Sequence, residues 1–515
     1  RLRWAENGRK RRKERCRLRK CFYQDPFKAA KQMVSPAVPV SLKVEKVVLD
    51  EYVREVASDP MREVDLGELA GLPAVPASKV AMNERPFTLT QFRNILRRRR
   101  TRSRPGPNKI PYSVYKKCPL IAKYLFEIFQ AVRRAKTAPL CWRTNDGIMI
   151  PKVACPVSSE IGDFRQIALL NVEGKLFWAL VADRLYNYLV VDNSYVSSEV
   201  QKGSMKKVAG CWEHTAMVWS ALKDARKSKS SLAALWLDLA NAYGSVPHKL
   251  IVFALRRYNV PEDVISLIMS YYDGLWGRTS ASGVSSDWMM YERGIFAGCT
   301  ISVVLFVAAF NVILEYVDVG EIERYKMSNG NTIELLRGFM DDVSIVASSV
   351  KGGKIALERF QVGVTWARMK VKPSKSRSFV MIKGRSMDVE PFVVGAVDDE
   401  MTGEVDGEPV VVGAVGGEVT GEVIPSLQRK PLKTLGRWYN PMVRDDWYRD
   451  DLRKKLDDGL KRLNKSHAKG AMKLWALHHI LLQQIRWDLM VYELPVSFVE
   501  KMETCLLYTS DAADE

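Results

Sequence analysis

Two neighbouring aspartates in apolar surroundings are the residues of this chain best suited to chemistry. Asp341 and Asp342 interrupt the apolar run 335–346, which predicts a hairpin of two buried strands with the pair at its turn. Four other aspartate pairs lie in polar surroundings, at 398–399, 445–446, 450–451 and 457–458. Burying two like charges is costly unless cations or donors compensate. The pair therefore indicates either a tight polar turn or a metal site.

A third carboxylate stands about a hundred residues upstream. Asp238 stands in the middle of the apolar stretch 232–243, which also predicts a buried strand. If this strand lies beside the hairpin, Asp238, Asp341 and Asp342 come together. Such oxygen ligands suit Mg²⁺, which takes one or two carboxylates plus waters and substrate phosphates. Two such ions can activate an attacking hydroxyl and neutralise a leaving pyrophosphate, as in polymerases and nucleases.

The elements around these aspartates resemble a known family. Residues 237–248 resemble the first catalytic-aspartate motif of reverse transcriptases, and residues 339–342 resemble the second. Further blocks follow in the order of that family, at 105–112, 150–152, 163–171, 294–302, 372–376 and 433–437. The nearest resemblance is to the reverse transcriptase domain of a non-LTR retrotransposon of the long interspersed element type. It covers roughly residues 86 to 440.

The resemblance implies a role for individual residues. Asp238, Asp341 and Asp342 would be catalytic and, with Leu239, would hold two Mg²⁺ ions, for which Mn²⁺ is a possible substitute. Lys375 would be the general acid for the pyrophosphate. The nucleotide would contact Lys152, Arg165, Tyr243 and Gly298, with Tyr243 excluding a 2′-hydroxyl. A guanidinium such as that of Arg165 can donate two hydrogen bonds to one phosphate. Leu435 and Gly436 would form the primer grip.

Four positions depart from the family pattern. Ala297 stands where the family usually has Gln, Val303 where it often has Pro, and Gly244 where many members have a second Asp. Gln166 replaces the usual Pro in a strand near the nucleotide. None of these changes removes a predicted metal ligand.

Composition favours a nucleic-acid partner. The 515 residues carry a formal net charge of +20, and 47% of them are hydrophobic. Such a positive surface concentrates polyanions. Two dense basic runs, at 9–20 and 97–104, are interpreted as phosphate-binding segments, although basic runs also serve as targeting signals. The eight cysteines and five histidines show no zinc spacing, so reduced cysteines in an intracellular protein, in nucleus and cytoplasm, are expected.

The predicted fold class is α+β, and the resemblance implies a right-hand polymerase with fingers, a palm of antiparallel sheet packed on helices, and a helical thumb. The expected divisions are a basic extension and linker over 1–85, fingers over 86–225, palm with primer grip over 226–440, and thumb over 441–505. The apolar stretch 301–314 is too short to span a bilayer and contains Asn311, so a core helix and no membrane contact are predicted.

Two segments are predicted to lie outside this plan. An acidic Gly/Val-rich sequence beginning at Pro391 recurs from Pro409, 18 residues later, and is interpreted as a tandem duplication within an insertion at 386–424 that lengthens a hairpin loop. Residues 506–515 resemble a translated adapter and are expected to be non-native. The resemblance also implies an endonuclease domain upstream, whose motifs are not present here.

Three functions remain open from the sequence. The first is an RNA-directed DNA polymerase that extends a primer on an RNA template, at a DNA target, with deoxynucleoside triphosphates. The second is a catalytically decayed remnant that only binds RNA, motivated by Ala297, Val303 and Gly244. The third, an RNA-dependent RNA polymerase, fits Tyr243 and residues 339–340 less well. The sequence specifies neither the template nor the oligomeric state.

Overall fold

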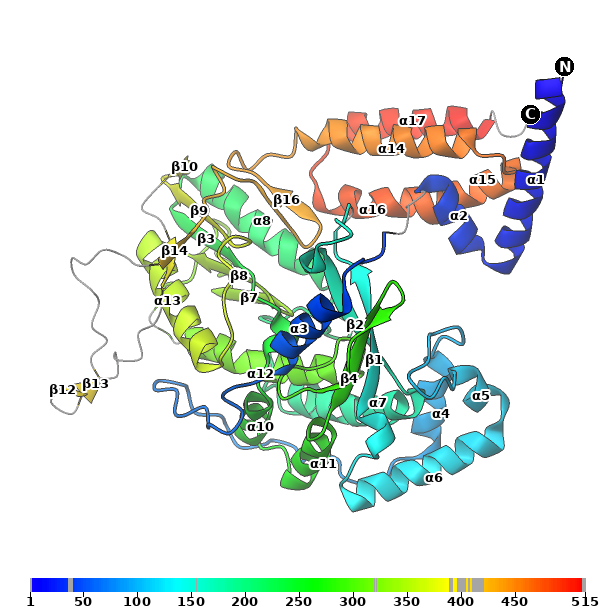
Figure 1. The fold of residues 1–515 in the computed structure, drawn as a ribbon. Coiled ribbons are helices and arrows are strands. Elements are labelled where there is room, and N and C mark those ends of the chain that lie inside the picture. Colours follow the sequence, from blue (N-terminus) through cyan, green and yellow to red (C-terminus); the bar gives the residue numbers. More distant parts are fainter. Residues whose placement is uncertain are drawn as a thin grey trace. The chain divides into compact units, whose positions relative to one another are not determined.

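The structure is a computed structural model. It describes residues 2–35, 40–153, 155–318, 320, 322–388, 392–395, 404–405, 408–409 and 421–511. The chain divides into two compact units, one of residues Val40–Lys430 and one that joins Arg1–Pro39 to Pro431–Glu515. Helices and strands are mixed throughout, which confirms the α+β prediction (Figure 1).

The larger unit is built on a five-stranded sheet in the order β10-β9-β3-β8-β7, here called the central sheet. Its neighbouring strands are all antiparallel. The strands are β3 Leu232–Leu237, β7 Leu336–Phe339, β8 Asp342–Ala347, β9 Arg377–Ile382 and β10 Arg385–Met387. Every residue of β3 is buried, as its unbroken apolar sequence predicts for a strand covered on both faces.

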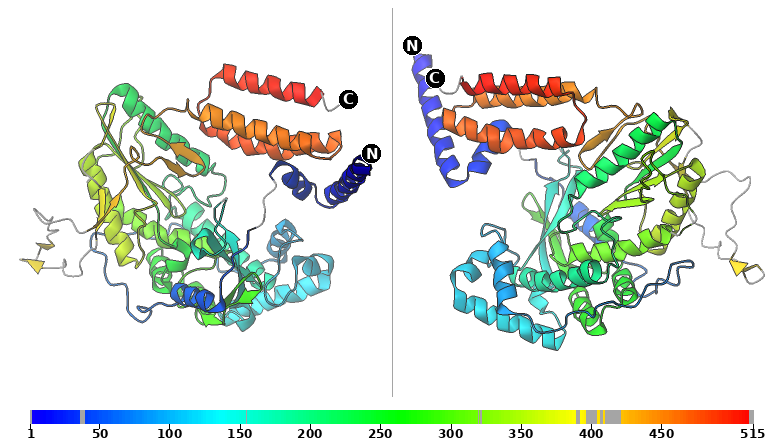
Figure 2. Two further views of the ribbon diagram at one scale, coloured as in Figure 1. Left: turned by 45° about the horizontal axis from the view of Figure 1, so that its top comes forward. Right: turned by 180° about the vertical axis from the view of Figure 1, so that it is seen from behind.

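Helices cover both faces of the central sheet. Gly353 of α13 approaches Ala233, whereas His214 of α8 contacts Ser344 of β8. Since Ala233 pairs with Ala347 and side chains alternate along β8, Ala233 and Ser344 point to opposite faces. The bounds of these helices are α8 Cys211–Ser228 and α13 Val350–Trp366, and both can be followed in the two views of Figure 2.

A second sheet of five strands lies in the same unit. Its order is β2-β1-β4-β5, and β6 also pairs with β4. The strands are β1 Thr144–Pro151, β2 Phe164–Leu170, β4 Trp276–Ala281, β5 Val284–Ser285 and β6 Met289–Met290. β1 and β4 are parallel, and their connection contains the whole of β3 with its flanking helices. Buried and more exposed residues alternate along β4. One face of this strand is therefore buried, and the other is partly exposed.

The remaining helices of this unit enclose its core. They are α3 Lys46–Ala57, α4 Leu89–Arg98, α5 Tyr112–Lys117, α6 Pro119–Ala135, α7 Val172–Tyr186, α9 Ala242–Ser245, α10 His248–Arg257, α11 Glu262–Tyr272 and α12 Ser302–Val317, with short turns η1 Leu140–Trp142, η2 Ile161–Asp163 and η3 Asn187–Asp192. The predicted core helix at 301–314 is α12. Its Asn311 is buried and donates to the carbonyl oxygen of Tyr195 and to Glu315.

The smaller unit is mainly helical. It contains α1 Leu2–Gln24, α2 Pro26–Val34, α14 Tyr448–Lys465, α15 Gly470–Ala476, η4 Leu477–Leu481, α16 Leu482–Val491 and α17 Val496–Asp511, and a hairpin of β15 Leu432–Thr434 and β16 Arg437–Tyr439. Leucines 452, 456, 460 and 463, predicted to share a helix face, are all buried in its core. Asp445 accepts two hydrogen bonds from buried Arg437, so its pair with Asp446 has a structural role.

The compact units divide the chain differently from the predicted extension and palm. Residues 1–39 belong with the C-terminal helices, whereas residues 40–85 belong with the larger unit, where Leu49 and Val53 are fully buried. The hairpin β15–β16 falls in the smaller unit and not with the central sheet.

The acidic insertion is described only in part. β11 Phe392–Gly395 pairs antiparallel with β14 Gly421–Ile424, and β12 Glu404–Val405 pairs with β13 Glu408–Pro409. The rest of the predicted duplication lies outside the described residues. The predicted non-native tail begins within α17, and residues 512–515 are also outside them. None of the described helices is long and apolar enough to cross a membrane.

Candidate active site

The aspartate pair lies at a hairpin turn, as predicted. β7 ends at Phe339 and β8 begins at Asp342, and these two residues pair with each other. Met340 and Asp341 form the turn between them, and Met340 has a positive φ of 58°. A non-glycine residue is rarely found in this left-handed conformation, so the surroundings must hold the turn in place.

The register of the central sheet brings the third carboxylate to the same end. Leu237, the last residue of β3, pairs with Val343 of β8. In an antiparallel pair the next residue of one strand faces the preceding residue of the other, so Asp238 lies beside Asp342. The backbone N–H of Asp238 donates to Ser376, and its carbonyl oxygen accepts from Lys372. Leu239 is buried and its backbone pairs with Val371.

The three carboxyl groups perturb one another. Burial raises the pKa of Asp342 to about 7, with further contributions from Asp341 and Asp238. Burial also raises the pKa of Asp341, and the charge of Asp238 adds to it. The pKa of Asp238 is raised by burial and is lowered again, in part, by nearby lysines. Negative charge at this end of the sheet is therefore incompletely compensated by the protein.

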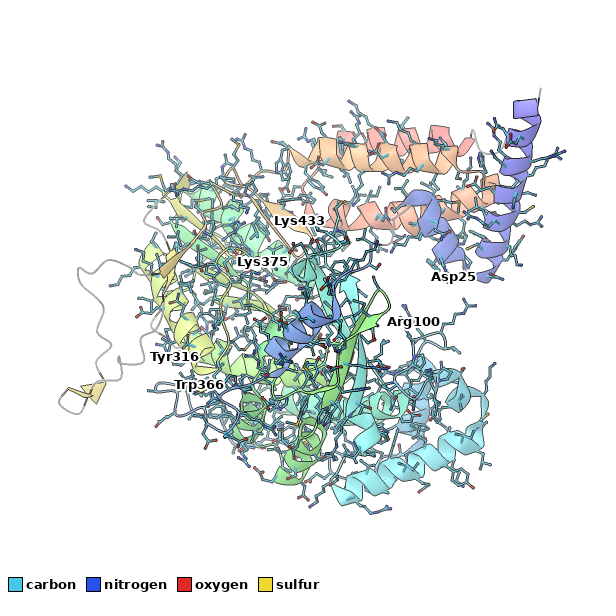
Figure 3. The ribbon with its side chains drawn as sticks, viewed as in Figure 1. Asp25, Arg100, Tyr316, Trp366, Lys375 and Lys433 are labelled. Atoms are coloured by element: carbon cyan, nitrogen blue, oxygen red, sulfur yellow. The ribbon has the colours of Figure 1, made fainter. Side chains whose placement is uncertain are left out.

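Cations from two sheets surround the carboxyl groups. Lys375, labelled in Figure 3, lies between α13 and β9. Its Nζ lies 3.9 Å from Asp238 Oδ2. Lys152 and Arg165 come from the ends of β1 and β2, and both side chains are exposed. The pKa of Lys152 is lowered by desolvation and then by Lys375 and Arg165, which places these cations within electrostatic range of one another. Arg165 and Lys375 also act on Asp341.

The donor set fits a divalent cation that keeps other ligands. Three half-buried carboxyl groups with raised pKa values gain most from a hard cation bound to oxygen. Among the described residues, no three Asp, Glu, His or Cys side chains are grouped closely enough to hold one ion by themselves. Mg²⁺ needs only one or two carboxylates when water and phosphate oxygens complete its shell. The arrangement thus suits an ion shared with a phosphorylated substrate.

Tyr243 lies near the carboxyl groups, and Gly298 lies against β2 of the second sheet. Tyr243 stacks on Phe306 of α12, with ring centroids 4.7 Å apart and planes 6° apart. Burial raises the pKa of Tyr243, and the charge of Asp341 raises it further, so the two residues are close. Gly298 has φ +119°, and a Cβ there would lie 2.6 Å from the carbonyl oxygen of Ala168 in β2. A side chain at 298 would therefore displace β2.

The two departures from the family pattern next to these residues have local explanations. Gln166, where a Pro was expected, donates from Nε2 to the hydroxyl oxygens of Thr279 and Tyr291. It therefore links β2 to β4 and to the residues after β6. The carbonyl oxygen of Ala297 accepts from the N–H of Ala168 at 2.9 Å, so the backbone contact with β2 is made without a glutamine side chain.

The predicted primer-grip residues lie at the β15–β16 turn. Leu435 and Gly436 both have positive φ, 46° and 80°. A Cβ on Gly436 would meet the Trp487 ring of α16 at 2.5 Å. Because this hairpin belongs to the smaller unit, its role at the carboxyl groups stays a prediction.

Sequence reasoning missed one residue that contacts the turn. Gln201 is fully buried and hydrogen bonds to the backbone of Met340. A glutamine in a polar stretch carries no sequence signal for such a contact, because its partner is a main-chain group far away in the chain.

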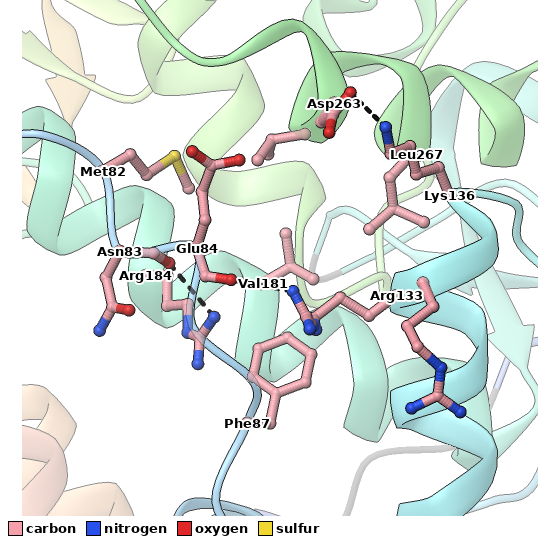
Figure 4. Close-up of a pocket in the computed structure, with 12 residues that line it drawn as sticks. Met82, Asn83, Glu84, Phe87, Arg133, Lys136, Val181, Arg184, Asp263 and Leu267 are labelled. Atoms are coloured by element: carbon pink, nitrogen blue, oxygen red, sulfur yellow. Dashed lines mark hydrogen bonds and ion pairs between the residues drawn. The ribbon is translucent and has the colours of Figure 1, made fainter.

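A cavity elsewhere in the larger unit is not part of this site. It has a volume of about 260 Å³ and lies between α6, α7, α11 and residues 82–87 (Figure 4). Its cations are already engaged. Arg184 donates to the carbonyl oxygens of Asn83 and Arg85, and Lys136 pairs with Asp263. These contacts tie the chain before α4 to the helices, which is a structural role.

The comparison with known proteins decides the family. Residues 150–438, more than half of the chain, match the family described as "Reverse transcriptase (RNA-dependent DNA polymerase)". The chain belongs to the reverse transcriptase family. This match contains the three aspartates 238, 341 and 342 and the cations Lys152, Arg165 and Lys375, and it ends just after the predicted primer grip. The family predicted from the motifs is thereby confirmed.

Two relatives specify the branch of the reverse transcriptase family. One is the "Retrovirus-related Pol polyprotein from type-1 retrotransposable element R2" of Nasonia vitripennis, 24% identical over 328 residues, or 62% of this chain and 30% of that protein. The other is the "Retrovirus-related Pol polyprotein from type-2 retrotransposable element R2DM" of Drosophila melanogaster, 23% identical over 413 residues, or 79% of this chain and 35% of that protein. The similarity supports the predicted non-LTR retrotransposon origin. The chain spans about a third of the length of these relatives.

Proposed function

We propose that this chain is the polymerising part of an RNA-directed DNA polymerase that extends a primer 3′-hydroxyl on an RNA template with deoxynucleoside triphosphates. In this proposal the central sheet is the palm, the second sheet belongs to the fingers, and the helices of 441–505 are the thumb. The observation that carries it is the meeting of Asp238, Asp341 and Asp342, with raised pKa values, beside Lys375.

The proposed cofactor is Mg²⁺, with Mn²⁺ as a substitute. Asp238, Asp341 and Asp342, with the backbone of Leu239, would hold two ions, which when bound activate the primer hydroxyl and neutralise the pyrophosphate. The protein's own contribution is to keep these oxygens together in a partly dry site, where charge interactions are stronger than in water.

The cations of the second sheet are proposed to receive the nucleotide. Arg165 can donate a pair of hydrogen bonds to one phosphate group, and Lys152 adds a second positive charge. Lys375, beside Asp238, is proposed to donate a proton to the leaving pyrophosphate. Holding the triphosphate between these groups aligns it with the primer, which accounts for much of the catalysis in phosphoryl transfer.

Tyr243 is proposed to select deoxyribose. Its ring is fixed by the parallel stack on Phe306, and a fixed ring can exclude the 2′-hydroxyl of a ribonucleotide sterically. Gly298 is proposed to allow the base of the incoming nucleotide to approach the backbone of β2. Leu435 and Gly436 are proposed to support the 3′ end of the primer.

The decisive assay is primer extension on primed poly(rA) with labelled dTTP, using residues 1–505. We expect a DNA product whose synthesis requires Mg²⁺. Ribonucleoside triphosphates should not replace dTTP as the substrate. Product made equally well from ribonucleotides would select the RNA polymerase alternative.

A decayed remnant is the second candidate. It is motivated by Ala297, Val303 and Gly244, at positions where the family usually has other residues. It predicts salt-dependent RNA binding, since phosphate neutralisation releases counterions, but no nucleotide incorporation with Mg²⁺ or Mn²⁺. Binding without incorporation would select it over the polymerase.

A further inference from the structure

The segment 197–203 holds the backbone of the turn that carries the aspartate pair. The N–H of Met340 donates to Gln201 Oε1 at 2.9 Å, and Gln201 Nε2 donates to the carbonyl oxygen of Met340 at 3.3 Å. One side-chain amide thus pairs with both polar groups of one turn residue. The same Oε1 accepts from the N–H of Gly203 at 2.8 Å, which fixes the amide in turn.

Backbone contacts continue along β7. The N–H of Lys202 donates to the carbonyl oxygen of Gly338 at 2.7 Å, and the N–H of Gly338 donates to that of Val200 at 2.8 Å. The segment therefore lies beside β7 like a short parallel strand, with Gln201 paired to Gly338. Lys202 is 4% exposed and its Nζ lies 3.0 Å from Glu213 of α8, so the segment is itself anchored.

Close approach at Gly203 brings the two backbones together. A Cβ on Gly203 would lie 2.4 Å from the backbone nitrogen of Met340. That distance is shorter than any ordinary contact, and the obstructing atom is main chain, which cannot rotate away. Any side chain at 203 would therefore push against the turn even with Gln201 intact.

These contacts matter because the turn is strained. Met340 has a left-handed conformation that a non-glycine residue adopts only when its surroundings impose it. The same conformation sets the directions of Asp341 and Asp342, which follow it in the chain. An amide side chain offers a donor and an acceptor on separate atoms, so it can pair with both the N–H and the C=O of one residue.

We propose that Gln201 is a positioning residue for the aspartate pair. It holds Met340 in the left-handed conformation through two hydrogen bonds, and so keeps Asp341 and Asp342 aimed at the metal position. The inference rests on the proposed function for its kinetic consequence, but metal affinity alone is enough to test it. Loss of the amide should let the turn relax and spread the carboxyl groups apart.

The test compares three variants of the full chain. Gln201→Met keeps the length of the side chain and removes both hydrogen bonds to Met340. Gly203→Ala leaves Gln201 intact and pushes on the turn from the other side. Gln130→Met is the matched control, because Gln130 is also buried and donates to a backbone oxygen, that of Phe87, away from the carboxyl groups.

Two readouts separate positioning from general stability. Mn²⁺ binding, followed by electron paramagnetic resonance without substrate, should weaken about tenfold in Gln201→Met and Gly203→Ala. In primer extension kcat should fall about 100-fold, the scale of a misplaced catalytic group, while KM for the primed template changes little. Gln130→Met should match the wild type in both, even if its melting temperature drops as far.

The outcomes are distinct. Wild-type Mn²⁺ affinity and kcat in both Gln201→Met and Gly203→Ala would overturn the inference, as would an equal loss in Gln130→Met. If the wild type binds Mn²⁺ but makes no DNA, the proposed function fails, and Mn²⁺ affinity of the variants still decides the role of Gln201. If the wild type binds no Mn²⁺, both proposals fall.

Discussion

The two sheets of the larger unit contribute side chains of opposite charge, and these side chains differ in how strongly they are desolvated. The central sheet supplies Asp238, Asp341 and Asp342 at the ends of buried strands, where desolvation raises their pKa values. The second sheet supplies Lys152 and Arg165 on exposed side chains at its edge. The acids are held by packing, whereas the cations remain free to follow a substrate. We infer that the first group serves the chemical step and the second serves binding.

This division follows from the physics of burial. A buried carboxylate is unstable without a cation, so its position must be built into the sheet and is costly to alter. An exposed guanidinium is well solvated by water in the free protein, and it forms strong charge-assisted hydrogen bonds when a phosphate binds. Substitutions in the two sheets should therefore change different kinetic constants.

The largest effect is expected for Asp341→Asn. Removing one proposed metal ligand should lower kcat by about 1,000-fold or more, because the metals contribute several kcal/mol to the transition state. Primer extension under single-turnover conditions measures it. Asp287→Asn is the control, since Asp287 is an exposed carboxylate on the second sheet's side that pairs with Lys46. Equal rates in wild type and Asp341→Asn would remove this aspartate from the metal site.

A smaller effect on a different constant is expected for Arg165→Met. Hydrogen bonds to charged groups are worth about 1.5–3 kcal/mol, so KM for the nucleotide should rise about 10- to 100-fold while kcat changes less. Steady-state kinetics over a range of dTTP concentrations measures the change. Arg165→Lys should recover part of it, because the charge returns without the planar fork. A fall confined to kcat would break the division between the sheets.

Selection between deoxyribose and ribose should depend on Phe306, which would act only through its stack on Tyr243. In Phe306→Ala the stack that fixes Tyr243 is lost, and aromatic pairs of this kind are worth about 0.5–1.5 kcal/mol. The preference for dTTP over UTP should therefore fall by at most about tenfold. Phe310→Ala is the matched control, since Phe310 stacks on Phe306 from further along α12. Unchanged preference in Phe306→Ala would mean that the ring of Tyr243 is fixed by other contacts.

The last expected effect concerns the pH dependence of stability and not a kinetic constant. His214 is 2% exposed and hydrogen bonds to Ser344, and burial with nearby Arg337 lowers its pKa to about 3. The unfolded chain, with a pKa of about 6.5 for this group, binds its proton first as pH falls. Stability from His214 is thus complete above about pH 6.5 and is lost as pH falls from about 6.5 to 3, by up to about 1.4 kcal/mol per pH unit.

Comparison with His214→Gln isolates this contribution from the carboxyl groups. Urea unfolding at several pH values should show a steeper loss for the wild type than for the variant. Parallel curves would indicate that the histidine is protonated, or exposed, in the folded chain.

The difference between the two sheets also explains what the sequence could predict. Asp238 was singled out because a lone charge in the middle of an apolar stretch is anomalous, and the register of β3 with β8 places it beside the pair, just after β3 ends. Lys152 and Arg165 were found only through the family resemblance, because lysine and arginine on exposed strand ends are ordinary. Their position near the carboxyl groups depends on how two sheets pack, which no local pattern encodes.

Residues 40–85 and Gln201 show where sequence reasoning stopped. The first segment was predicted to be an extension because it is rich in Pro and Val, yet Leu49 and Val53 are fully buried against the larger unit. Gln201 meets Met340 across 139 positions of sequence. Both depend on long-range contacts, in which the partner surface is created only by folding.

The most direct test of the central claim is the rate of dTTP incorporation on primed poly(rA) as Mg²⁺ is titrated from zero. The account predicts no product with a chelator present, a steep rise at low Mg²⁺ because two ions are needed, and a shift to higher Mg²⁺ when Asp238 is changed to Asn. Incorporation that persists with the chelator, or that is indifferent to Asp238→Asn, would contradict it.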